Sequence, residues 1–161
     1  MCQFNPKWLM VSLVIGVTSL LPPVTQAEKK PETNLDISSN TLSDQNIFGP
    51  GDKLEVTLSL TNFKKKEHCD VYVAIFSEAE NQLRFLDSSN FLSDTPVPYL
   101  ENTKEESIKI YGKRLAFSLV GQHILYAVCV VPGTPPQQVP TSPDKWTGGL
   151  SINNWFLTRS F

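Results

Sequence analysis

The sequence has few of the residues that metal sites and hydrolytic active sites require. Its 161 residues include three cysteines and two histidines. They contain no Gly-x-Ser-x-Gly turn, no metalloprotease helix motif and no phosphate-binding glycine loop. A tetrahedral zinc site draws most of its ligands from cysteine and histidine, and a catalytic nucleophile needs a base beside it. We therefore expect no metal, no cofactor and no catalytic residues, and we predict that the chain is not an enzyme.

The sequence also lacks an excess of charge of either sign. It has 14 basic and 16 acidic side chains, a formal net charge of −2. Nucleic-acid-binding proteins carry a basic excess, so we expect no nucleic-acid partner. The one basic run, Lys64 to Lys66, is followed by Glu67 and is typical of a solvated turn, with a patch for anionic surfaces as the alternative.

The apolar run at the N-terminus is too short to span a bilayer. It extends over 14 residues, Trp8 to Leu21, whereas a membrane helix needs about 18 or more. Lys7 precedes it, and Thr25-Gln26-Ala27 places small side chains where signal peptidase requires them. We predict that residues 1–27 are a cleaved signal peptide, that the protein is secreted or periplasmic, and that no membrane span remains. An uncleaved N-terminal anchor is the alternative.

The sequence does contain segments in which apolar and polar side chains alternate as they do in β-strands. Residues 53–62, KLEVTLSLTN, alternate between apolar and polar side chains, which predicts a strand with one buried face. Residues 69–77, CDVYVAIFS, are apolar on both faces, which predicts a central strand whose second face is at least partly covered. Further strands are expected at 82–87, at 107–120 (one strand bent at Gly112, or two short ones), at 122–131 and at 151–161.

The remaining segments are predicted to be irregular. Residues 28–43 read as a flexible lead-in that can include a first edge strand, and residues 88–106 as a long loop. Residues 132–149 hold five prolines and three glycines, with one helical turn expected at Ser142 to Trp146. About seven strands without a long helix predict an antiparallel β-sandwich over residues 44–161.

The order of these pieces resembles a β-sandwich module of immunoglobulin or fibronectin-III type that recurs in exported bacterial proteins. The string is FGPGDKLEVTLSLTN, then CDVYVAIF, QLRFL, GQHILYAVCVVPGT and PDKWTGGLS. The resemblance implies a fold and an extracytoplasmic compartment. It transfers no catalytic residues.

Two cysteines remain after signal cleavage, Cys69 and Cys129. In a sandwich of this kind, the strands that hold them are expected to be antiparallel neighbours in one sheet, with Cys69 directly opposite Cys129. This pairing predicts a disulfide, and two buried free thiols are the alternative. Under the same pairing His123 would stand opposite Ile75, away from both sulfurs, so no metal ligand set forms.

Sandwich modules commonly present loops and edges to partners, so binding is the favoured function. The candidate contacts are Trp146, Tyr99 and Tyr111, aromatic residues in or beside the irregular segments. Trp146 as a lid over the core is the alternative reading, and Trp155 is expected to pack within the last strand. We predict a non-catalytic binding or adhesive module for a protein or polysaccharide outside the cytoplasm. The alternatives are a small exported hydrolase or enzyme inhibitor and, on the strength of the terminal Phe161, a small outer-membrane β-barrel.

Overall fold

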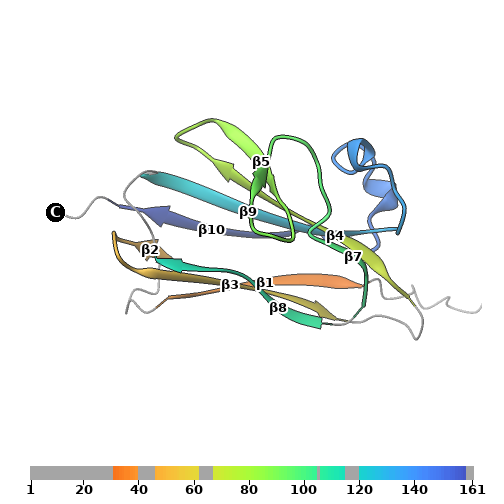
Figure 1. Cartoon of the computed structure of the whole chain (residues 1–161), viewed down its shortest axis with the longest axis horizontal. Helices are drawn as coiled ribbons and strands as arrows, with labels where there is room; N and C mark the ends of the chain where they lie inside the picture. Colours follow the sequence, from red (N-terminus) through yellow and green to blue (C-terminus); the bar gives the residue numbers. More distant parts are fainter. Residues whose placement is uncertain (1–30, 40–45, 62–66, 105, 115–119, 159–161) are drawn as a thin grey trace, which may run out of the picture.

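The computed structural model describes residues 31–39, 46–61, 67–104, 106–114 and 120–158, with the backbone alone for residue 39 and residues 111–114. The predicted signal peptide and the basic run Lys64 to Lys66 lie outside these residues. The described chain forms two β-sheets that stack as layers (Figure 1). The predicted all-β sandwich is confirmed.

The smaller sheet has three antiparallel strands in the order β1-β3-β8. They are β1 (Glu32–Ser39), β3 (Lys53–Thr61) and β8 (Glu106–Arg114). The alternation predicted for β3 is confirmed, because Leu54, Val56, Leu58 and Leu60 are buried and the residues between them are not. Residues 32–39 of the predicted lead-in form the regular strand β1, at the edge of this sheet.

The larger sheet contains the other strands of the described chain. Its main path is β2 (Ile47–Phe48), β10 (Ser151–Leu157), β9 (Gly121–Val130), β4 (Cys69–Ser77), β5 (Gln82–Leu86) and β6 (Leu92–Ser93), and β7 (Leu100–Thr103) pairs with β4. All pairings are antiparallel except that of β2 with β10. The strands predicted at 69–77, 82–87, 122–131 and 151–161 are all present within a few residues of their expected bounds.

Two sequence-based expectations about the strands need correction. Residues 88–106 are not a loop throughout, since β6 and β7 lie within them and β8 begins at Glu106. The strand predicted at 107–120 is described from Glu106 to Arg114 as one strand with a β-bulge two residues before Gly112, and residues 115–119 lie outside the described residues. Val56 pairs with Tyr111 and the next residue, Thr57, pairs with Lys109, which leaves Ile110 as the extra, buried residue.

The main core fills the space between the two sheets. It includes Leu58 and Ile110 from the smaller sheet and Val71, Val73 and Leu125 from the larger one. A second apolar cluster lies on the opposite, outer face of the larger sheet. Its members are Tyr72, Ala74, Phe85, Val128, Val130 and Val139, with Val97, Tyr126 and Trp146 packed against them. The expected covering of the second face of β4 is therefore confirmed.

The segment between β9 and β10 supplies part of that covering (Figure 1). It contains two single 3-10 turns, η1 (Pro136–Gln138) and η2 (Pro143–Lys145). The turn predicted at Ser142 to Trp146 is confirmed, although Ser142 caps it without a side-chain hydrogen bond. No helix in the described part of the chain has the length and apolarity needed to cross a membrane.

Candidate binding groove

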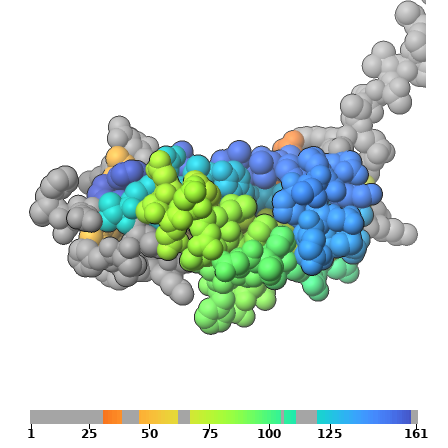
Figure 2. Space-filling model, turned by 90° about the horizontal axis from the view of Figure 1, so that it is seen from above, coloured from red at the N-terminus to blue at the C-terminus, as the bar shows by residue number. Residues whose placement is uncertain are grey.

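An open, largely apolar groove of about 310 Å³ lies on the outer face of the larger sheet. Figure 2 shows this face, with the segment after β9 (blue) beside the chain from β4 to β7 (green). The lining residues are Tyr72, Ala74, Phe76, Leu83, Phe85, Tyr126, Ala127, Val128, Val139, Pro140, Trp146 and Leu150. We call this site the outer groove.

The floor of the outer groove follows from strand alternation. Tyr72 and Ala74 pair with Val128 and Tyr126 across the β4–β9 ladder. Side chains of directly opposed residues lie on the same face of a sheet, so these four point outward together. Their neighbours along each strand, such as Val73 and Ala127, pack into the main core. Because β4 and β9 are apolar on both faces, their inner side chains belong to the main core and their outer side chains form the floor of the groove.

The segment from residue 131 to 150 forms one wall, and backbone hydrogen bonds fix it to the end of β9. The amide of Val131 donates to Lys145 O, and the amide of Thr147 donates to Cys129 O, each at 2.9 Å. Trp146 Nε1 donates to Val139 O at 2.9 Å across the segment. The indole of Trp146 therefore covers part of the second apolar cluster, and its uncovered part lines the groove.

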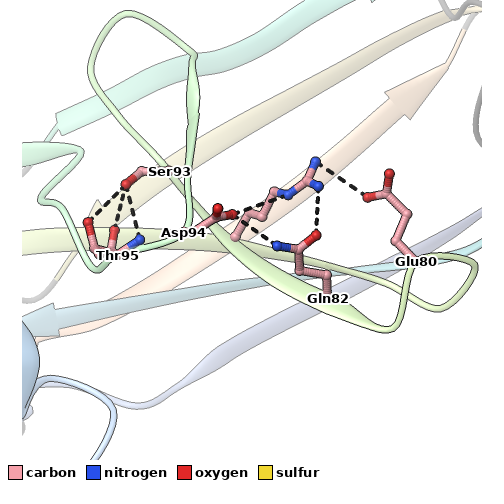
Figure 3. A network of polar contacts seen from close by, with 6 residues as sticks. Glu80, Gln82, Ser93, Asp94 and Thr95 are labelled. Atoms are coloured by element: carbon pink, nitrogen blue, oxygen red, sulfur yellow. Dashed lines mark hydrogen bonds and ion pairs between the residues drawn. The ribbon is translucent and has the colours of Figure 1, made fainter.

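The hairpin of β4 and β5 forms the opposite wall through Leu83 and Phe85. A polar network holds this hairpin to the chain that follows β6 (Figure 3). Arg84 lies 3.4 Å from Glu80 and 3.5 Å from Asp94, and it donates to Gln82 Oε1 at 2.6 Å. Because these contacts join the hairpin to the following loop, the wall has a defined position.

Asp70 lies two residues before Tyr72 on β4, so its carboxylate is on the same outer face of the larger sheet, beyond the lining of the outer groove. Asp70 Oδ1 accepts a hydrogen bond from the amide of Asn102 at 2.8 Å, and Oδ2 accepts one from the amide of Gly133 at 3.0 Å. Burial raises the pKa of Tyr72 above its usual value, and the negative charges of Asp70 and Glu101 raise it further. Acidic groups therefore border the Tyr72 end of the outer groove.

The structure separates the three predicted contact residues. Trp146 lines the outer groove. Tyr99 is 5% exposed and belongs to the main core, so the expectation of a surface contact there is corrected. Its amide donates to Val71 O at 2.7 Å, which holds the residue against β4, and burial raises the pKa of its hydroxyl, as does Asp87. Tyr111 belongs to β8 in the other sheet, and its side chain lies outside the described residues.

The sequence reasoning missed four of the five aromatic rings of the groove, namely Tyr72, Phe76, Phe85 and Tyr126. Each lies on the outer face of a predicted strand, Tyr72 and Phe76 in β4, Phe85 in β5 and Tyr126 in β9. The available signal was the aromatic content of the second face of residues 69–77, 82–87 and 122–131.

Cys69 and Cys129 form a disulfide between β4 and β9, with their Cα atoms 5.6 Å apart. The expected bridge between adjacent strands of one sheet is present, but the expected register is wrong. Val71, not Cys69, is directly opposite Cys129, so the bridge is diagonal. Side chains alternate with a period of two, and a two-residue shift therefore keeps both cysteines on the inner face.

The same shift moves His123 opposite Ser77 and not Ile75. Its ring stacks on Trp155 in β10, with the ring centroids 5.6 Å apart, and Trp155 packs in the main core as expected. Within the described ranges, no three side chains of His, Cys, Asp and Glu gather as a metal ligand set.

Comparisons with known proteins supply no argument about the fold or the function of this chain. No family model matches the chain, and no curated protein matches it. Among solved structures, the chain is similar to the CARDB domain of a Pyrococcus furiosus protein, which was crystallised in complex with di-metal ions. The match has 11% sequence identity and a TM-score of 0.38, and it covers 82% of this chain and 97% of that domain. At this level of likeness, neither metal binding nor any other activity of that domain transfers to this chain.

Proposed function

We propose that the protein is an exported, non-catalytic binding module that holds a segment of an extracytoplasmic protein in the outer groove. The observation that carries this proposal is the groove itself, an open site with five aromatic rings on the outer face of the larger sheet. Concave apolar sites with few polar groups are the usual form of a binding site.

A protein segment suits the outer groove better than a polysaccharide. The lining has few polar side chains, and the indole N–H of Trp146 is already bonded to Val139 O. Sugar rings stack on aromatic side chains, but their hydroxyl groups also need hydrogen-bond partners, which are costly to leave unpaired. Apolar side chains of a peptide need only the rings and aliphatic groups that are present.

The predicted export agrees with the disulfide, because such bonds persist in oxidising compartments. The N-terminal signal predicted for residues 1–27 points to the same compartment. We therefore propose that the protein acts in the periplasm or the medium.

Peptide selection tests this function. Random heptapeptides displayed on phage are selected against the full chain, and the affinity of the enriched peptides is measured by calorimetry. The groove variant is Leu83→Ser with Leu150→Ser, because these lining residues are 41% and 42% exposed and their replacement spares the core. The matched control is Phe91→Ser, which is 70% exposed and lies outside the lining.

We expect the groove variant to weaken binding about tenfold or more, since two apolar contacts are lost, and the control to bind as the wild type does. Trp146→Ala is a poorer test because the indole also supports the second apolar cluster. Equal binding by the groove variant and the wild type would refute the proposal. Binding of a glycan panel without any enriched peptide would favour the polysaccharide reading instead.

A further inference from the structure

We infer that the segment held in the outer groove carries a lysine or arginine beside its apolar side chains. This inference rests on the proposed function and specifies the chemistry of the partner. It depends on how charge and aromatic rings are distributed around the groove.

The first observation is the negative charge at the Tyr72 end. Asp70 lies two residues before Tyr72 on β4 and pairs with Val130 of the second apolar cluster, so its side chain is on the outer face of the larger sheet. The charges of Asp70 and Glu101 both act on Tyr72, which lines the groove. Asp70 accepts hydrogen bonds from two backbone amides, which orient the carboxylate without neutralising it. In the part of the chain that the structure describes, the ion pairs found involve neither of these two carboxylates.

The second observation is that no cationic side chain is among the described residues that line the outer groove. Arg84 pairs with Ile75, so its side chain is on the inner face of β5, between Glu80 and Asp94. Lys145, next to Trp146, is 3.8 Å from Asp144. The walls therefore contribute little positive charge to offset the acids at the Tyr72 end.

The third observation is the aromatic lining. Tyr126 and Trp146 are partly exposed and line the same groove, and the face of an aromatic ring attracts a cation. Aromatic rings and carboxylates thus favour the same sign of charge in the occupant. A basic, apolar segment complements both, whereas an acidic segment would be repelled at the Tyr72 end.

Three small probes with the same hydrocarbon chain separate charge from apolar contact: hexylammonium, hexanol and hexanoate. Each is titrated into the full chain, and binding is followed by NMR through the indole N–H of Trp146 and the amide of Tyr72. We expect hexylammonium to bind about fivefold more tightly than hexanoate, with hexanol between them. The preference should shrink in about 0.3 M salt, because salt screens exposed charges.

Glu101→Gln tests the source of the preference, and Asp36→Asn on β1 of the other sheet is its matched control. Glu101→Gln should bring the affinities of the charged probes closer together and leave hexanol unchanged. Asp36→Asn should leave all three affinities unchanged.

Equal binding of the three probes, or tightest binding of hexanoate, would overturn this inference and leave the proposed function standing. Absence of binding by all three would also overturn it. The proposed function would then be judged by the peptide selection alone, so that the two failures can be told apart.

Discussion

Glu55 lies on the outer face of β3 between two lysines. Its carboxylate contacts Lys53 on the same strand and accepts a hydrogen bond from Lys109 on β8 at 2.8 Å. These two hydrogen bonds, that of Lys109 first, lower the pKa of Glu55 from 4.5 to about 2. The folded-state pKa is below the unfolded value, so the ionised group stabilises the fold above about pH 4.5. That contribution is lost as the pH falls toward 2.

We expect the side-chain carboxyl of Glu55 to titrate near pH 2 in a carbon-detected NMR experiment. Lys109→Met should move the midpoint up toward 4.5 and reduce the loss of stability between these two pH values. Lys104→Met, which removes a lysine outside this cluster, is the control and should leave the midpoint unchanged. A wild-type midpoint near 4.5 would contradict the assigned contacts.

Tyr99 and Trp146 show how little residue type alone says about exposure. Both are aromatic, and both were predicted to be surface contacts because proline-bearing segments surround them. Tyr99 pairs its amide with β4 and turns its ring into the core, whereas Trp146 keeps an uncovered part in the outer groove. The two residues differ in exposure because each is held by a different part of the chain that is distant in sequence.

Strand β1 connects the two sheets through side chains. The buried hydroxyl of Thr33 lies 3.0 Å from Ser151 Oγ, 3.3 Å from Gly149 O and 3.4 Å from Ala127 O. Asn153 Nδ2 donates to Leu35 O at 3.0 Å. The strand therefore pairs by its backbone with β3 in one sheet and is held to β9 and β10 in the other.

Thr33→Val keeps the shape of the side chain but removes the hydroxyl that bridges the sheets. We expect the free energy of unfolding to fall by about 1 kcal/mol or somewhat more, the usual net value of a hydrogen bond whose partner is left buried. Urea denaturation measures this change. Thr57→Val on the outer face of β3 is the matched control, and an equal effect of both substitutions would show that β1 is not held in this way.

The β4–β9 pair shows what a strand pattern leaves open at the scale of elements. Alternation placed both cysteines on the inner face, and the structure agrees. Alternation does not distinguish registers that differ by two residues, because both bury the same face. The predicted opposition of Cys69 and Cys129 was therefore wrong although the bridge itself is present.

At the scale of the whole molecule, the disulfide closes a loop with a sequence separation of 60. This loop runs from β4 through the β5 hairpin and β8 to β9, so it includes strands of both sheets. Such a cross-link restricts the unfolded chain, and the loop-entropy model gives about 4 kcal/mol for a loop of this size. Both cysteines are fully buried, which shields the bond from reductant in the folded state.

The variant Cys69→Ala with Cys129→Ala should lower the free energy of unfolding by about 4 kcal/mol in a denaturant titration. Dithiothreitol, present during the titration, should lower the free energy of unfolding of the wild type. It should have no effect on the variant, which is therefore the control for the reductant. Mass spectrometry that finds two free thiols in the exported protein would contradict the bridge.

The sequence by itself determined the strands β3, β4, β5, β9 and β10, the sandwich and the presence of two cysteines on one face, because alternation with a period of two is a local property of the chain. It also placed Trp146 in a turn beside the last strand. Only the tertiary structure decided the register of β4 on β9, the burial of Tyr99 and the assembly of the outer groove. These features depend on which residues from distant strands and loops come to lie side by side, and a pattern along one strand carries no information about its neighbours.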